Sequence, residues 1–351
     1  MSIARILLHE APGETRAAAF DAVGRPVRLF LERWDGRGEP ATLGDVVQAR
    51  LRQNDPKDGG AFFERTNGER IFVRDELPKG LSEGAETSLE IRAEARHGKL
   101  ARASLSTKAE PAVDSVFERW FDTLPDDVPE PKKATTPEEF DQIDAAFDEA
   151  LSTRCGLPKG GLVRLERTSA LIAADIDTAG RLQKGSAGAR ALSTNREAVT
   201  TIARQLALRD WGGLIVIDCI GPLTADARTT LRTEFLKTFQ SLSSRKPDAL
   251  KPSRFGLLEA QIAWGACPIG DRLLDEGGQP TPDTELLDLF RQAEREATAN
   301  RSAFYRLTLS PHALKAYITR RNECDAILQE AFSGRVTIAS GTGERSVVRR
   351  A

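Results

Sequence analysis

The chain has 351 residues, of which 40% are hydrophobic and 29% are charged, and its net charge is −2. These values are typical of a soluble globular protein with two or three domains. No apolar run approaches the ~20 residues that a transmembrane helix needs, and the amino-terminal apolar segment is too short for a signal peptide. We therefore expect a cytoplasmic protein without a membrane partner. The four cysteines are scattered, which argues against a disulfide framework.

The small net charge hides an uneven distribution along the chain. Residues 107–150 contain 13 acidic and 4 basic side chains, whereas residues 181–254 contain 13 basic and 6 acidic side chains. A local basic patch favours a polyanionic substrate such as a nucleic acid. The alternative is that the acidic and basic segments attract each other within one protein.

Residues 1–106 have the pattern of a β-rich domain. Short runs with β-branched and aromatic residues, such as VRLFLERW and ERIFVRD, recur at intervals and are separated by Gly, Pro and Asp. Asn67-Gly68 is a strong signal for a tight hairpin. Short, regularly spaced strands predict a small barrel over this range.

Residues 107–155 are predicted to be an acidic connector with two helices. The first helix contains the apolar stretch around Trp120. The second is predicted to start at Thr136, because Thr136 and Glu139 form a capping box and Pro137 takes the first helical position.

Residues 156–270 are predicted to be a mixed α/β core. Two apolar runs, 161–166 and 170–176, flank a compact turn and predict a hairpin. A capping box at Thr194 and Glu197 then predicts a helix, and a further apolar strand follows it. The order strand, helix, strand normally gives a right-handed crossover between parallel strands.

The two strands that flank this helix end on carboxylates: Asp175 and Asp177 in the first strand, and Asp218 in the second. If the strands are parallel neighbours, Asp175 and Asp218 lie at the same edge of the sheet, within ~5–7 Å of each other. Two carboxylates that close repel unless a proton or a cation lies between them. Mg²⁺, which is bound by one or two carboxylates and several waters, fits that arrangement. The alternative is that these aspartates are helix caps or ordinary surface residues.

The loop after the first of these strands, RLQKGSAGAR, is rich in glycine and basic residues. Arg181, Lys184 and Arg190 are therefore candidates for phosphate binding. The alternative is an ordinary surface loop.

Residues 271–351 are predicted to form a small α+β domain. Ser310-Pro311 predicts a helix start after the strand-like run FYRLTLS, and Gly334 precedes the strand-like run RVTIAS. These features by themselves indicate no chemistry.

Three segments carry a resemblance to a known family: GGLVRLERTSALIAADID at 160–177, TNREAVTTIARQLALRDWGGLIVIDCI at 194–220 and SRFGLLE at 253–259. They resemble the catalytic core of the ribonuclease E/G family. The resemblance implies a multidomain protein of α+β and α/β type, with an OB-type RNA-binding barrel, a helical connector, a DNase I-like catalytic core and a small carboxy-terminal domain. It also implies an endoribonuclease that cleaves single-stranded RNA in RNA processing or decay.

Transferred residue by residue, the resemblance assigns the metal ion to Asp175 and Asp218. The expected ion is Mg²⁺, with Mn²⁺ as a substitute. Asp177 falls where the family usually has an asparagine that assists this pair, so we expect a third catalytic residue with an added negative charge. In the segment SRFGLLE, Arg254 is the residue that we assign to RNA binding.

In the barrel, the resemblance implies that Phe62, Phe63 and Phe72 stack on bases and that Lys99 binds phosphate. The alternative is that two of these three phenylalanines belong to the barrel core, since strand alternation places the adjacent Phe62 and Phe63 on opposite faces.

The chain departs from the family in two further places. The connector has no room for the module that senses a 5′-monophosphate, so we expect 5′-end sensing to be absent or different. The family has a Cys-Pro-x-Cys clasp that holds zinc between protomers, whereas this chain has Cys267-Pro268-Ile269-Gly270. Thiolate zinc sites need their full set of ligands. We therefore expect no zinc and no zinc-linked dimer, and a homo-oligomer of another kind stays open.

Two functions compete on this basis. The first is a metal-dependent endoribonuclease, in which the ion activates water and neutralises charge at the scissile phosphate. The second is a non-catalytic RNA-binding protein derived from a ribonuclease, which the short connector and Asp177 favour. A DNA-directed enzyme is a third reading.

Overall fold

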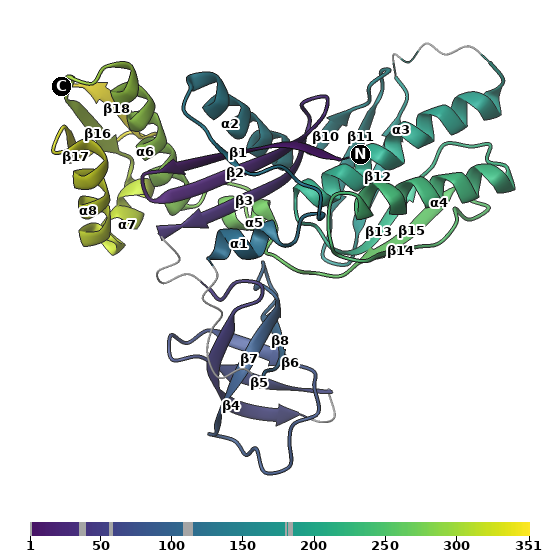
Figure 1. The fold of residues 1–351 in the computed structure, drawn as a ribbon, viewed down its shortest axis with the longest axis horizontal. Helices are drawn as coiled ribbons and strands as arrows, with labels where there is room; N and C mark the ends of the chain where they lie inside the picture. Colours follow the sequence, from purple (N-terminus) through teal and green to yellow (C-terminus); the bar gives the residue numbers. More distant parts are fainter. Residues whose placement is uncertain (1, 35–39, 56–58, 108–114, 180, 182–184) are drawn as a thin grey trace.

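The computed structural model describes residues 2–34, 40–55, 59–107, 115–179, 181 and 185–351. Its elements form four units (Figure 1): a first sheet, a closed barrel, a central sheet with two long helices, and a carboxy-terminal unit. This architecture agrees with the predicted class of a mixed α+β multidomain protein. In the part of the chain described, no helix is long and apolar enough to cross a membrane.

The first sheet has the strand order β3-β2-β1-β9. It consists of β1 (Ile3–Ala11), β2 (Glu14–Asp21) and β3 (Pro26–Arg33), which are antiparallel, and β9 (Lys132–Lys133), which is parallel to β1. One face packs on α2 (Pro137–Leu151), and the other face shares a core with the central sheet. Because both faces are covered, β2 and β3 are almost continuously buried.

Five strands close the barrel in the order β4-β5-β6-β8-β7: β4 (Val46–Asp55), β5 (Gly60–Glu64), β6 (Arg70–Val73), β7 (Glu86–Ala93) and β8 (Ala101–Leu105). Asn67-Gly68 lies in the hairpin between β5 and β6, as predicted. The sequence prediction of one barrel over residues 1–106 began too early, because the first three strands belong to the first sheet. Strands that are apolar on both sides are typical of a sheet covered on both faces.

The connector contains the two expected helices, and each begins with a capping box. The first, α1 (Val116–Phe121), begins with a capping box between Ser115 and Glu118. The second, α2, begins with the predicted capping box between Thr136 and Glu139 and with proline in its first turn.

The central sheet has the order β10-β11-β12-β13-β15-β14: β10 (Arg154–Gly156), β11 (Leu162–Arg167), β12 (Ile172–Asp177), β13 (Gly213–Asp218), β14 (Pro247–Ala249) and β15 (Leu257–Ile262). The predicted hairpin of β11 and β12 is antiparallel, and β12 and β13 are parallel neighbours, as expected for the crossover. The crossover helix is α3 (Ala187–Leu208), and α4 (Ala225–Gln240) follows β13.

Helix α3 begins two turns earlier than the capping box at Thr194 predicted. Its N-cap is Ser186, whose side chain accepts a hydrogen bond from the backbone of Ala189. The hydroxyl of Thr194 donates to the carbonyl of Arg190 inside the helix. The alanine-rich stretch after Ser186 has enough helix propensity to continue the helix back to this cap.

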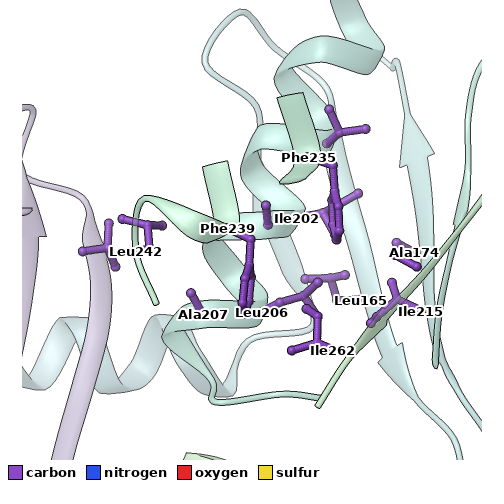
Figure 2. Close-up of a cluster of buried hydrophobic side chains, with 14 of the residues drawn as sticks. Leu165, Ala174, Ile202, Leu206, Ala207, Ile215, Phe235, Phe239, Leu242 and Ile262 are labelled. Carbon is purple, nitrogen blue, oxygen red and sulfur yellow. The ribbon is translucent and has the colours of Figure 1, made fainter. Parts of the chain in front are cut away.

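Helices α3 and α4 cover one face of the central sheet. Figure 2 shows side chains of the helices packed against side chains of the strands: Ile202, Leu206, Phe235 and Phe239 against Leu165, Ala174, Ile215 and Ile262. Alternate residues of the strands point the other way. They form what we call the open face, which includes Arg154, Arg164, Glu166, Asp175, Asp177, Leu214, Asp218, Leu257 and Glu259.

The carboxy-terminal unit is a three-stranded sheet, β17-β16-β18, packed on helices. Its elements are α6 (Pro282–Ala299), β16 (Tyr305–Leu309), α7 (Pro311–Thr319), α8 (Arg321–Phe332), β17 (Val336–Ser340) and β18 (Val347–Arg350), and the short α5 (Ile269–Leu273) precedes them. Ser310 caps α7 and proline follows it, as predicted. This unit and the central sheet lie at opposite ends of the molecule (Figure 1).

Candidate functional site

Asp175 and Asp218 lie directly opposite each other on neighbouring parallel strands. The register pairs Asp175 of β12 with Asp218 of β13, and both side chains are exposed on the open face. Neighbouring strands are ~4.8 Å apart, so the two carboxylates are close neighbours. In the part of the chain that the structure describes, no hydrogen bond or ion pair engages either carboxylate. The pair is therefore accessible and uncompensated.

Asp177 lies two residues further along β12 and is half-buried. One of its carboxylate oxygens accepts a hydrogen bond of 2.8 Å from the backbone of Ala179, which fixes the turn after the strand. Among the described residues, no three or more His, Cys, Asp or Glu side chains are grouped so as to hold a metal ion. The candidate metal ligands are thus the pair Asp175 and Asp218. This donor set fits Mg²⁺, which keeps several waters and binds to one or two carboxylates.

The backbone that follows Asp218 is held by a buried asparagine of α3. The side-chain amide of Asn195 donates to the carbonyl of Ile220 at 2.8 Å, and its oxygen accepts from the amide of Ile220 at 2.9 Å. Cys219, which lies between Asp218 and Ile220 in the chain, is buried. Burial and the nearby charge of Asp218 raise the pKa of its thiol to about 12. Asn195 therefore positions the exit of β13, and Cys219 stays neutral beneath it.

The turn before β15 brings a cation and an aromatic ring to the same end of the sheet. Leu257 is the register partner of Asp218 on β15, and Arg254 and Phe255 immediately precede this strand. The guanidinium of Arg254 lies 4.8 Å from the ring centre of Phe255, which is 75% exposed. An exposed arginine on an aromatic ring suits a nucleotide, because phosphates bind the cation and bases stack on the ring.

The predicted phosphate-binding loop is only partly available. The side chain of Arg181 is 2% exposed and donates to both carboxylate oxygens of Glu197, at 2.9 and 2.8 Å, and to the carbonyl of Gly160. This contradicts a phosphate-binding role for Arg181, because its guanidinium is buried and committed to Glu197. Arg190 lies in the first turn of α3 and donates to the carbonyl of Gly185 at 2.6 Å. Lys184 lies outside the described residues.

The barrel separates the three predicted aromatic contacts into two groups. Phe63 is fully buried in the barrel core, so its predicted stacking on RNA is wrong. Phe62 and Phe72 are cross-strand partners on the outer surface, with ring centres 5.1 Å apart. The guanidinium of Arg70 lies 5.4 Å from the ring centre of Phe62. Exposed aromatic rings beside a cation are suited to stacking on nucleic-acid bases.

The turn between β7 and β8 reaches the central sheet. It carries the exposed Lys99 and also Arg96, whose guanidinium lies 4.2 Å from the ring of Trp264. Together with Leu214 of the open face, these residues line a cavity of about 320 Å³. The side chain of Glu94 anchors the turn by accepting from the backbone of Leu43 and of Cys267. The barrel is therefore fastened beside the open face.

Two residues that sequence reasoning missed extend the carboxylate pair into a row. Arg154 of β10 is the register partner of Arg164 of β11, and Arg164 is the register partner of Asp175. The alternation around Arg164 already indicates an outward side chain. Its place beside Asp175 depends on the hairpin register, which the sequence pattern alone does not specify.

The fold and the site together define a multidomain α+β protein in which an exposed carboxylate pair lies beside basic and aromatic surfaces. Residues 106–261 match the model of the Ribonuclease E/G family. This segment, which is similar to that family, contains all three site aspartates.

Three relatives illustrate the similarity. Ribonuclease E of Haemophilus influenzae is 38% identical over 128 residues, which cover 34% of this chain and 12% of that protein. Ribonuclease E of a Synechocystis species is 32% identical over 145 residues, which cover 41% of this chain and 21% of the relative. Ribonuclease G of Haemophilus influenzae is 35% identical over 86 residues, which cover 24% of this chain and 18% of the relative. The chain thus matches a small part of each relative's length.

Proposed function

We propose that the chain is a metal-dependent endoribonuclease that cleaves single-stranded RNA. The observation that carries this proposal is the exposed, register-paired Asp175 and Asp218 without a protein partner in the described part of the chain. The match of residues 106–261 to the Ribonuclease E/G family model and the similarity to Ribonuclease E and Ribonuclease G support it.

In this proposal Asp175 and Asp218 hold a divalent cation, Mg²⁺ or Mn²⁺. When bound, such a cation supplies Lewis acidity and charge neutralisation at a phosphodiester. Asp177 adds negative charge beside the pair and keeps the end of β12 in place through its hydrogen bond to Ala179. Arg254 contacts the phosphate backbone at the exit of β13.

In this proposal the barrel binds the single-stranded RNA. Phe62 and Phe72 offer two neighbouring ring faces to unpaired bases, and Arg70 adds a cation beside them. Bases in a duplex are already stacked on each other, so this surface favours single-stranded RNA. Lys99 and Arg96 continue the cationic path toward the open face.

A cleavage assay tests the proposal. We expect the wild type to cut a labelled, AU-rich single strand in Mg²⁺ and to lose this activity in EDTA. The double variant Asp175→Asn, Asp218→Asn is expected to lose at least about a hundredfold, since the charge stabilisation at the phosphate disappears. Asp248→Asn removes an exposed carboxylate from the edge strand β14 and serves as the matched control, with activity retained.

The outcomes of the cleavage assay distinguish between the candidate functions. Cleavage that persists in the double variant contradicts the assignment of the metal site. Asp177, which stands where the family usually has an asparagine, favours the second candidate, a non-catalytic RNA-binding protein. Tight RNA binding by the wild type without any metal-dependent cleavage would support that candidate. Competition between RNA and DNA of the same sequence tests a DNA-directed role.

A further inference from the structure

We propose that Arg154 and Arg164 form a phosphate-binding pair that holds the RNA strand beside the carboxylate pair. This inference rests on the proposed function, and it assigns one substrate contact that the aspartates cannot provide. We call these two residues the arginine pair.

The strand register places the arginine pair in one row with the aspartates. Arg154 is opposite Arg164, Arg164 is opposite Asp175, and Asp175 is opposite Asp218. All four side chains are exposed on the same open face. With strands ~4.8 Å apart, the centre of the arginine pair lies ~10 Å from the centre of the carboxylate pair. An arginine side chain is long enough to contact a phosphate at or next to the one beside Asp175.

The row combines two like-charge register pairs with one opposite-charge pair, Arg164 and Asp175. Like charges directly opposite each other destabilise a sheet, and the row contains two such pairs, one basic and one acidic. Within the described ranges, neither Arg154 nor Arg164 forms an ion pair that would relieve the repulsion. An anion on the arginine pair and a cation on the carboxylate pair relieve both. Local conflict of this kind is characteristic of functional sites.

The surrounding charge explains why RNA needs this pair. Three other charged residues of the open face, Glu166, Asp177 and Glu259, are acidic and repel a polyanion. On the six strands of the central sheet the other basic residue is Arg167, which is ion-paired with Asp271. The planar guanidinium matches phosphate oxygens in a bidentate fashion. Among the residues of these strands, the arginine pair is therefore the attractive contact for the RNA strand, and Arg254 lies outside them in the turn before β15.

Binding without cleavage tests the inference. Affinity for a fluorescent single-stranded RNA is measured by anisotropy in EDTA as a function of salt, with wild type and with Arg154→Gln, Arg164→Gln. Each phosphate contact on a single strand contributes about 0.7 to the slope of log K against log salt, so the variant should have a slope shallower by about 1.4. Its melting temperature should be unchanged or higher, because a like-charge pair is removed.

The matched control is a second arginine pair far from the site. Arg306 of β16 and Arg349 of β18 are also exposed register partners, and they lie in the carboxy-terminal unit at the opposite end of the molecule. Arg306→Gln, Arg349→Gln makes the same change in net charge and should leave the slope unchanged. An unchanged slope in the first variant, or an equal loss in both variants, would overturn the inference.

Neutral linkages in the RNA locate the contact. A methylphosphonate beside the cleaved bond should weaken binding to the wild type and have no further effect on Arg154→Gln, Arg164→Gln, because coupled partners are not additive. Additive losses would contradict a contact at that phosphate.

The proposed function and the arginine pair can fail separately. If the wild type shows no metal-dependent cleavage but the variant has the expected shallower slope, the proposed function fails and the arginine pair is supported. If the aspartates are needed for cleavage and the slope of the arginine variant is unchanged, the proposed function is supported and the inference about the arginine pair fails.

Discussion

The two charged pairs at the site differ in their effect on the stability of the fold. Asp175 and Asp218 are exposed like charges whose repulsion is softened by water, so their arrangement is tolerable without a ligand. Arg181 and Glu197 are instead mostly buried and satisfy each other, together with the carbonyl of Gly160. The first pair is suited to binding a ligand, and the second is suited to holding the chain that follows β12 against α3.

Removal of the buried ion pair should lower stability. Glu197→Gln leaves the guanidinium of Arg181 buried without a countercharge, so we expect a loss of about 1–2 kcal/mol, at the lower end for buried pairs because Glu197 is partly exposed. Urea unfolding at neutral pH measures this loss. Glu234→Gln breaks the more exposed pair with Arg196 and should cost less than about 1 kcal/mol. Equal losses in the two variants would contradict a special role for Glu197.

The ion pair of Arg181 and Glu197 also predicts how the stability of the protein changes with pH. Burial acts to raise the pKa of Glu197, but hydrogen bonds from Arg181 and Lys159 and their charges outweigh it and hold the pKa below the ordinary value of 4.5. The stabilisation is therefore complete above pH 4.5 and is lost as the pH falls through the lowered pKa of the folded state. The stability difference between wild type and Glu197→Gln should shrink in acid, and a constant difference would contradict the assignment.

At the scale of elements, the barrel separates packing from binding through strand alternation. Phe63 points into the core and Phe62 points outward beside Phe72. Phe63→Ala should cost about 3–5 kcal/mol of stability through the cavity that it leaves. Phe62→Ala should leave stability nearly unchanged and weaken single-stranded RNA binding by about 1–3 kcal/mol. Thermal unfolding and anisotropy in EDTA measure the two effects, and normal RNA affinity of Phe62→Ala would contradict base stacking there.

Elements with strong local signals were predictable from the sequence. The capping box at Thr136, the hairpin at Asn67-Gly68 and the parallel crossover that pairs Asp175 with Asp218 follow from short-range chemistry and from handedness. The start of α3 was missed, because a second plausible cap at Ser186 competes with Thr194.

Features that depend on long-range pairing were not predictable. The edge strand β9 pairs with β1 across about 125 residues of chain, and this pairing has no local signal in the sequence. The row that joins Arg154 to Asp218 needs the register of three strand pairs, and a slip of one residue would turn each side chain to the other face. Burial of Arg181 likewise depends on the approach of α3 to the preceding loop.

Across the whole molecule, a basic turn of the barrel meets the face of the central sheet that carries the carboxylate pair. The turn of the barrel with Arg96 and Lys99 meets the open face at Leu214. Leu214 and Asp218 lie on the same face of β13, four residues and so ~13 Å apart. An RNA strand bound at this turn would therefore lie close to the carboxylate pair. The carboxy-terminal unit lies away from the central sheet (Figure 1).

A crystal soaked in Mn²⁺ provides the most direct measurement, because the ion is located by its anomalous scattering. We predict a peak between the carboxylates of Asp175 and Asp218, and no such peak in crystals of Asp175→Asn, Asp218→Asn. A wild-type crystal with no peak between these carboxylates, or with the manganese bound elsewhere on the chain, would contradict the account.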